Sequence, residues 1–201
     1  MRCFTWWRVV LLTLVTATAI ADGSQTLAAQ ANSGIEYRVL ATSKTSTMEK
    51  EINEAAEAGF RFQAIMGGET AVGGKEAVAV VSRTGESKGR FGYKLLATSK
   101  TSTMEKELQE AADAGFEYRD QKVFKSTFGG EEVVCILERD KDTVSSQRSQ
   151  YKLLATSKTS TLEKELREAG AAGYQVVGMT VAKTAMGGKE LVAITRRVRA
   201  Q

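Results

Sequence analysis

The chain has 201 residues, of which 42% are hydrophobic and 26% are charged, and it contains no histidine. This composition is typical of a folded globular protein and excludes a disordered one. The formal net charge is +4, but nucleic-acid binding is predicted by a clustered basic surface rather than by a small net charge. We therefore expect no specific nucleic-acid partner.

Residues 1–21 have the three parts of a secretory signal peptide. Arg2 and Arg8 make the start positive, residues 9–20 form an uncharged run, and Ala19-Ile20-Ala21 has the small-residue pattern of a cleavage site. The alternative, an uncleaved membrane anchor, is disfavoured because a spanning helix needs about 20 apolar residues. We predict an exported protein, periplasmic or extracellular, with no stable membrane insertion after cleavage. Loss of the two arginines leaves 26 of the 28 basic residues against 24 acidic ones.

Three stretches of 47 residues, Tyr37–Arg83, Tyr93–Arg139 and Tyr151–Arg197, align with one another without a gap. Internal repeats of this length indicate one supersecondary unit per copy. The segments between them are rich in Gly, Ser and charged residues, which is typical of linkers. The predicted division is a signal peptide at 1–21, a flexible leader at 22–34, repeat 1 at 35–83, a linker at 84–92, repeat 2 at 93–139, a linker at 140–150 and repeat 3 at 151–198.

A helix with both ends marked follows a short first strand in each repeat. In repeat 1, Ser46 and Glu49 have the spacing of a capping box, in which two side chains bind N–H groups at the start of a helix. Gly59 suits the left-handed backbone that closes a helix. Between these ends the apolar residues recur at helical spacing and form one stripe, Met48, Ile52, Ala55 and Ala56.

Two further strands follow the helix, joined by a turn that contains two adjacent glycines. In repeat 2 the last strand, Val133–Leu137, is apolar at every position, so both of its faces need cover. A unit of 47 residues is also near the lower limit for independent folding. We therefore predict an α+β fold in which three tandem β-α-β-β modules pack as one pseudo-symmetric body, with mostly antiparallel sheets. An odd number of modules leaves one face unpartnered, so a homo-oligomer stays open.

Cys135 is the single cysteine that remains after removal of the signal peptide, so the mature chain forms no intrachain disulfide. A cross-link between two chains is one interpretation. The other is a buried thiol that acts as a small hydrophobic residue. The second is favoured because Cys135 lies inside the apolar strand and its counterparts in the other repeats are Ala79 and Ala193.

The order of motifs in the third repeat resembles that of a known bacterial family. These motifs are Tyr151-Lys152-Leu153-Leu154, Leu162 with Leu166, Gly173-Tyr174-Gln175-Val176-Val177, a Gly-Gly turn, and Leu191-Val192-Ala193-Ile194 before Arg196-Arg197. They resemble the domain of unknown function 4177, a β-α-β-β unit that typically has Gly-Trp-Glu-Leu-Val where this chain has Gly-Tyr-Gln-Val-Val. The resemblance extends to all three copies. It implies the fold and no particular chemistry.

One segment is almost identical in the three repeats. Leu40–Glu51 recurs at Leu96–Glu107 and at Leu154–Glu165, and only one position differs, where two methionines become Leu162. A capping box requires only two of these residues, and the Thr-Ser-Lys-Thr stretch has no expected core contact. The candidate ligand or partner residues are therefore Thr42, Ser43, Lys44, Thr45, Thr98, Ser99, Lys100, Thr101, Thr156, Ser157, Lys158 and Thr159.

Hydroxyl groups, a lysine and backbone N–H groups meet at the positive end of each helix, where anionic groups are favoured. Three such loops would bind a polymeric ligand by avidity. We expect an anionic envelope polymer or a protein partner. Recent duplication, or contacts between the loops in the packing of the repeats, would also explain the identity. A nucleotide P-loop is excluded because no glycine lies between Leu40 and Gly59.

We predict no catalytic, metal or cofactor site. Histidine, the commonest general base and metal ligand, is missing from the sequence. The carboxylates of the predicted helix are better explained as its solvated side, and Lys44 lies in a polar loop where it would not act as a base. The alternative to a binding function is a structural or assembly protein that oligomerises through its sheet faces.

Overall fold

The computed structural model describes residues 34–70, 74–85, 87–98, 100–125, 131–143, 148–183 and 188–199. The predicted signal peptide, the leader up to residue 33 and the candidate residue Ser99 lie outside these ranges. The described residues belong to one compact unit, Ser33–Gln201. Among them, no helix has the length and apolar character needed to cross a membrane.

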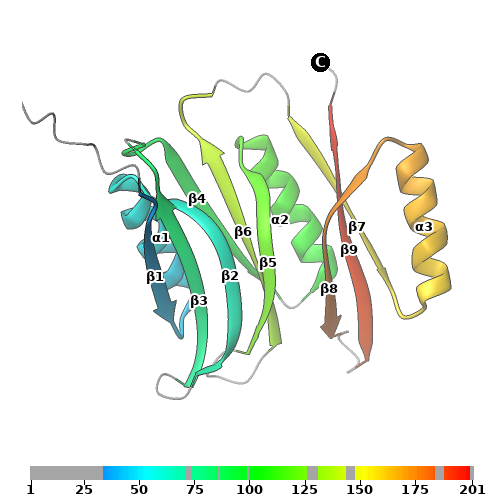
Figure 1. Ribbon diagram of the computed structural model, residues 1–201. Helices are drawn as coiled ribbons and strands as arrows, with labels where there is room; N and C mark the ends of the chain where they lie inside the picture. Colours follow the sequence, from blue (N-terminus) through cyan, green and yellow to red (C-terminus); the bar gives the residue numbers. More distant parts are fainter. Residues whose placement is uncertain are drawn as a thin grey trace, which may run out of the picture. The chain divides into compact units, whose positions relative to one another are not determined.

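Three modules of order β-α-β-β follow one another along the chain (Figure 1). Module 1 contains β1 (Glu36–Thr42), α1 (Thr45–Glu57), β2 (Arg61–Thr70) and β3 (Gly74–Arg83). Module 2 contains β4 (Phe91–Thr98), α2 (Thr101–Asp113), β5 (Glu117–Lys125) and β6 (Glu131–Asp140). Module 3 contains β7 (Ser149–Thr156), α3 (Thr159–Ala171), β8 (Gln175–Lys183) and β9 (Lys189–Val198).

Each module forms its own antiparallel three-stranded sheet with the last strand in the centre. The orders are β1-β3-β2 in sheet A, β4-β6-β5 in sheet B and β7-β9-β8 in sheet C. The second and third strands are hydrogen-bonded neighbours in every sheet, as expected for a hairpin. The predicted α+β fold of three β-α-β-β modules is confirmed.

The strands extend into both predicted linkers. Residues 91–92 open β4, residue 140 ends β6, and residues 149–150 open β7. Pairing continues one residue further, since Lys141 N donates to the Arg90 carbonyl at 2.8 Å. Backbone pairing requires no particular side chain, so a prediction from polar composition alone made the linkers too long and the strands too short.

The helices begin one residue before the predicted capping serines. Helix α1 starts at Thr45 with Lys44 as its extended N-cap residue, and neither it nor the N-cap residue of α2 or α3 makes a side-chain capping hydrogen bond. The predicted capping box of Ser46 and Glu49 is therefore wrong, and the same spacing in the other repeats, Ser102–Glu105 and Ser160–Glu163, forms no capping box either. The closing glycine is confirmed, because Gly59 has a φ of 91°. The apolar stripe is also confirmed, and its four residues are buried.

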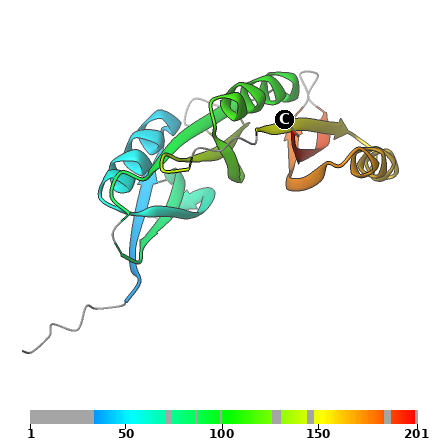
Figure 2. The same ribbon diagram turned by 90° about the horizontal axis from the view of Figure 1, so that it is seen from above.

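Adjacent modules share their hydrophobic cores. One cluster joins Met48 and Ile52 of α1 both to sheet A and to Tyr93, Val134 and Ile136 of sheet B. A second cluster joins α2 in the same way to sheet B and to sheet C. Helices α1 and α2 thus each pack between two sheets, whereas α3 packs on sheet C of its own module (Figure 2).

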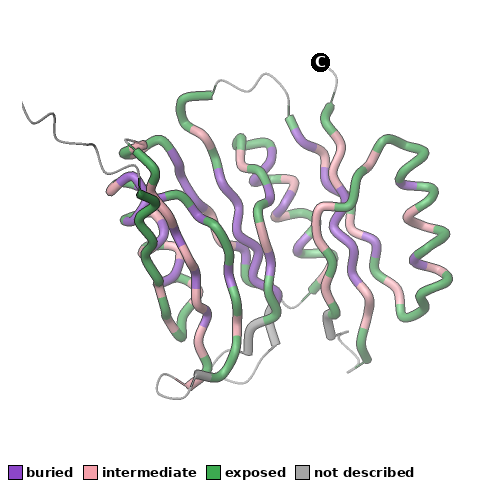
Figure 3. Tube along the Cα trace, viewed as in Figure 1, coloured by how far each residue is buried: buried purple, intermediate pink, exposed green. Residues whose placement is uncertain are grey.

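Strand β6 is buried on both faces, as predicted. Val133, Cys135 and Leu137 belong to the cluster around α2, and Val134 and Ile136 belong to the cluster around α1. Figure 3 shows this buried run in β6, in contrast to the exposed residues that predominate in β1 and α3. Cys135 is a fully buried free thiol, and the predicted core position is confirmed.

Candidate functional site

The three candidate loops, residues 42–45, 98–101 and 156–159, each join the first strand of a module to its helix. Figure 1 shows these junctions at the same, lower end of the three modules. The lysine of every loop is exposed, and so are Ser43 and Ser157. The structure therefore places three copies of one polar motif along one side of the described unit.

The first threonine of each loop closes a turn. Thr42 Oγ1 accepts a hydrogen bond from Lys44 N at 3.2 Å, and the equivalent bonds of Thr98 and Thr156 measure 3.2 and 3.3 Å. A Ser or Thr hydroxyl stabilises a turn in this way. The Lys44 carbonyl then accepts the first helical hydrogen bond from Met48 N. This geometry explains why the threonine recurs, but it places no requirement on the exposed serine and lysine.

The starts of the three helices keep their positive character. Their first turns, which read Thr-Ser-Thr, contain no acidic residue, and their N-cap lysines supply no side-chain acceptor. The first N–H groups of a helix have no acceptor within the helix, and the helix dipole adds roughly half a positive charge there. An exposed lysine next to these groups makes each helix start a favourable position for an anion.

The glutamate predicted to cap the helix binds the next module instead. Glu49 Oε2 accepts a hydrogen bond from Leu95 N in β4 at 2.7 Å, and Glu105 Oε2 accepts one from Leu153 N in β7 at 2.8 Å. In module 3 the equivalent Glu163 forms an exposed ion pair with Arg167. Because the contacts of Glu49 and Glu105 join residues more than 40 positions apart, no local pattern predicts them.

A second pair of side chains completes each contact between modules. The Asn53 amide donates to the Tyr93 carbonyl at 3.0 Å and accepts from Tyr93 N at 2.9 Å. In the next module Gln109 Oε1 accepts from Tyr151 N at 3.1 Å. The side-chain amides thus satisfy backbone groups at the edge of the neighbouring sheet, which is the role of a strand partner.

Two tyrosine hydroxyls of the following modules bind backbone groups of the preceding modules at the same interfaces, here called joints. Tyr93 Oη accepts a hydrogen bond from Phe62 N at 2.9 Å, and Tyr151 Oη accepts one from Tyr118 N at 2.8 Å. Burial is the main cause that raises the pKa of both hydroxyl groups above the usual range. Both tyrosines therefore stay protonated at physiological pH.

A buried carboxylate, Glu138, lies at the joint of modules 1 and 2. It receives hydrogen bonds from Arg61 at 2.8 Å, from Tyr93 Oη at 2.8 Å and from Arg119. Burial alone would raise the pKa of Glu138, but the bonds from Arg61 and Tyr93 and the charge of Arg119 outweigh it, so the pKa lies below its usual value. The group is thus an ionised structural anchor and not a general acid.

A cavity of about 650 Å³ lies beside this anchor and is lined by residues that include Glu117, Arg119, Glu138 and Lys141. None of its lining residues comes from the three candidate loops. Within the described ranges, no group of three or more acidic, cysteine or histidine side chains is arranged to hold a metal ion.

Comparison with family models, curated proteins and solved structures finds no match to the chain. The resemblance to the domain of unknown function 4177 therefore stays a prediction from the motifs given above.

Proposed function

We propose that the chain is a non-catalytic exported protein that binds an extended anionic ligand along its three Thr-Ser-Lys-Thr loops. The observation that carries the proposal is the threefold occurrence of an uncapped helix start next to an exposed lysine. The inter-module use of Glu49 and Glu105 supports it, because these carboxylates bind strand N–H groups and do not cap the helix starts.

The ligand class follows from the weakness of a single loop. A charge at a helix end contributes about 0.3–1 kcal/mol when it is exposed, so one loop binds a monomeric anion poorly. Three loops on one folded unit raise the affinity for a ligand that reaches all of them, by about 10²- to 10⁴-fold for linked sites. A polyanion of the cell envelope fits an exported protein with this arrangement.

A charge-matched pair of triple variants tests the proposal. Lys44, Lys100 and Lys158 are changed together to alanine in one variant. The control changes Lys50, Lys106 and Lys164, which are exposed on the helices and pair with glutamates four residues on. Both variants lose the same net charge. Binding to linear polyphosphate, with orthophosphate as the monomeric comparison, is measured at increasing salt concentration.

We expect the wild type to bind polyphosphate more tightly than orthophosphate by at least about 100-fold. The loop variant loses this binding, and the helix variant keeps most of it. Two results would overturn the proposal: no binding of the wild type at low salt, or equal losses in the two variants, which would reveal a response to net charge alone.

A further inference from the structure

The same interface between modules occurs twice in the molecule, between modules 1 and 2 and between modules 2 and 3. Module 1 and module 3 each carry one uncovered half of this interface. The inner face of each sheet is the face that packs on the helix of its own module, and the outer face is the opposite one. At each internal joint a helix and the inner face of its sheet cover the outer face of the next sheet. In the described part of the chain, no preceding module covers the outer face of sheet A, and no following sheet packs on α3 and the inner face of sheet C. Each of these two surfaces is one half of the repeated joint.

The first open half is the outer face of sheet A, here called the head surface, with Tyr37, Val39 and Met66. Tyr37 is 63% exposed, whereas its counterparts Tyr93 and Tyr151 are each 4% exposed at the internal joints. Val39 is also 63% exposed. The strand that carries both residues, β1, is an edge strand of its sheet.

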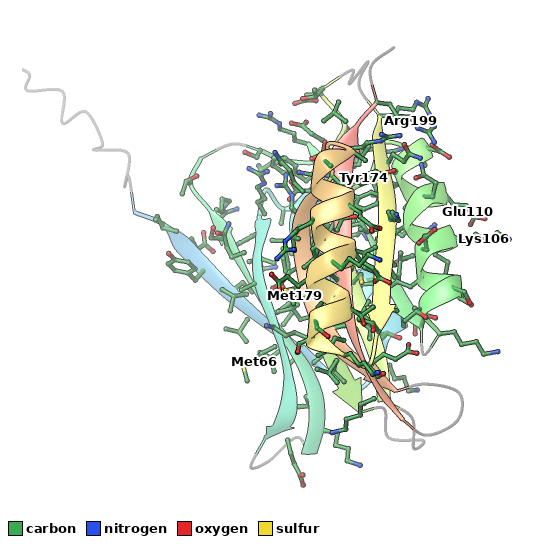
Figure 4. All side chains as sticks on the ribbon, turned by 90° about the vertical axis from the view of Figure 1, so that its right-hand side faces the viewer. Met66, Lys106, Glu110, Tyr174, Met179 and Arg199 are labelled. Atoms are coloured by element: carbon green, nitrogen blue, oxygen red, sulfur yellow. The ribbon has the colours of Figure 1, made fainter. Side chains whose placement is uncertain are left out.

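The second open half is the tail surface, formed by Val176, Met179 and Val181 of β8 together with Glu163 on α3. Val176 is 49% exposed, whereas its counterparts Phe62 and Tyr118 are 7% and 8% exposed. Figure 4 looks onto α3 and labels Met179 beside it. Met179 pairs with Ala193, so it lies on the sheet face that packs against α3.

We propose that the head surface of a second copy of this chain docks on the tail surface and repeats the internal joint. The equivalent hydrogen bonds are then determined. The Tyr37 hydroxyl of one copy accepts from Val176 N of the other, as Tyr93 does from Phe62 N. The Glu163 carboxylate accepts from Val39 N, as Glu49 does from Leu95 N.

The charges at the two ends are compatible with this joint. The internal joints contain the ion pair Arg61–Glu138 at 2.8 Å and, with the signs exchanged, Glu117–Arg196 at 3.5 Å. The equivalent residues at the open ends, Gln175 and Ser82, are both uncharged. Joining the ends therefore buries no unpaired charge at this position, which would be strongly unfavourable.

One substitution makes the joint between copies weaker than the internal joints. Asn53 and Gln109 accept a backbone N–H at the internal joints, but the equivalent residue on α3 is Arg167, whose guanidinium only donates. It is able to bond the Tyr37 carbonyl but not the Tyr37 N–H. Assembly is accordingly reversible and depends on concentration.

Because head and tail are different surfaces, the contact is heterologous and does not close on itself in a pair. Each added copy presents a new head or tail, so the assembly either closes into a ring or grows as an open fibre. The assembly uses none of the residues of the Thr-Ser-Lys-Thr loops, and so it is independent of the proposed anion binding.

Sedimentation of the purified chain over a range of concentrations tests the inference with complementary variants. Val39→Asp blocks the head and Val176→Asp blocks the tail. The control, Val198→Asp, changes a 58% exposed valine on the face of sheet C that carries Ile194 and packs towards α2, so it lies on neither open surface. Circular dichroism checks the fold of each variant. We expect the mean mass of the wild type and of Val198→Asp to increase with concentration, while each blocked variant stays monomeric.

An equimolar mixture of the two blocked variants gives the decisive result. Each variant retains the half that the other lacks, so the mixture forms dimers and nothing larger. A wild type that stays monomeric at its highest soluble concentration, or a mixture that stays monomeric, would overturn the inference. Assembly that survives the triple lysine change separates it from the anion-binding proposal.

Discussion

Glu49 and Leu95 lie in different modules, yet the Glu49 carboxylate accepts the Leu95 N–H at 2.7 Å. The same glutamate in module 3, Glu163, is bound to Arg167 of its own helix. One sequence segment thus performs two tasks, depending on whether a further module follows. This difference supplies a matched internal control.

Glu49→Ala is expected to lower the free energy of unfolding by about 1–3 kcal/mol, because it removes a charged acceptor and leaves a strand N–H unsatisfied. Glu163→Ala changes the same residue in the same sequence context and is expected to shift it by less than about 0.5 kcal/mol. Urea unfolding at low protein concentration measures both. Equal losses would mean that Glu49 acts within its helix and not at the joint.

Tyr93→Phe tests the hydroxyl that anchors the first joint. The variant keeps the ring but removes the acceptor of Phe62 N and a donor to Glu138, so we expect a loss of about 1–3 kcal/mol. Tyr37→Phe, at the equivalent exposed position, is expected to have almost no effect on the monomer. Thermal unfolding of the two variants under the same conditions measures both changes in stability. A Tyr93→Phe variant as stable as the wild type would exclude an anchoring role.

Much of the module architecture is predictable from sequence, because it depends on local periodicity. The stripe around Met48 and the doubly apolar strand Val133–Leu137 each specify which faces are buried. The helix start is not predictable in the same way. The Ser46–Glu49 spacing matches a capping box, but in all three modules the first loop threonine binds the N–H of the lysine and the helix begins directly after that lysine, one residue before the serine.

The joints themselves depend on contacts far apart in the sequence. Arg61 and Glu138 are 77 residues apart, and nothing in either local sequence identifies the other as its partner. For the candidate loops, sequence identity located the segment correctly, but only the geometry separates the threonine that closes the turn from the exposed serine and lysine. Ser99 falls outside the described ranges.

Glu138 is expected to make stability depend on pH. Its folded pKa lies below the unfolded value of about 4.5, so its contribution is fully present above that value and is lost as the pH falls through the folded pKa. Glu138→Gln should therefore cost about 2 kcal/mol at pH 7. The difference from the wild type should narrow below about pH 4.5. A difference that is constant from pH 7 to pH 3 would contradict an ionised anchor.

Cys135 is expected to be inert in the native protein. Burial is the main cause that raises its pKa from 9.0 to about 12, so very little thiolate forms at pH 8 and alkylation of the native protein is much slower than that of the unfolded protein. Iodoacetamide labelling of a chain that begins at residue 22, in which Cys135 is the single cysteine, measures the ratio with and without denaturant. Rapid labelling of the native protein would show that β6 is accessible.

Shared cores between modules are the central claim, and they are tested most directly by removing the neighbours. Module 2 alone, residues 91–141, retains α2 and sheet B but loses the partners of Ile136 and Val134 in module 1 and those of Leu108 in module 3. Thermal unfolding followed by far-ultraviolet circular dichroism is predicted to show no cooperative transition for this fragment, and a single transition for the full chain. A cooperative melt of the monomeric fragment would contradict the claim and show that the modules fold independently.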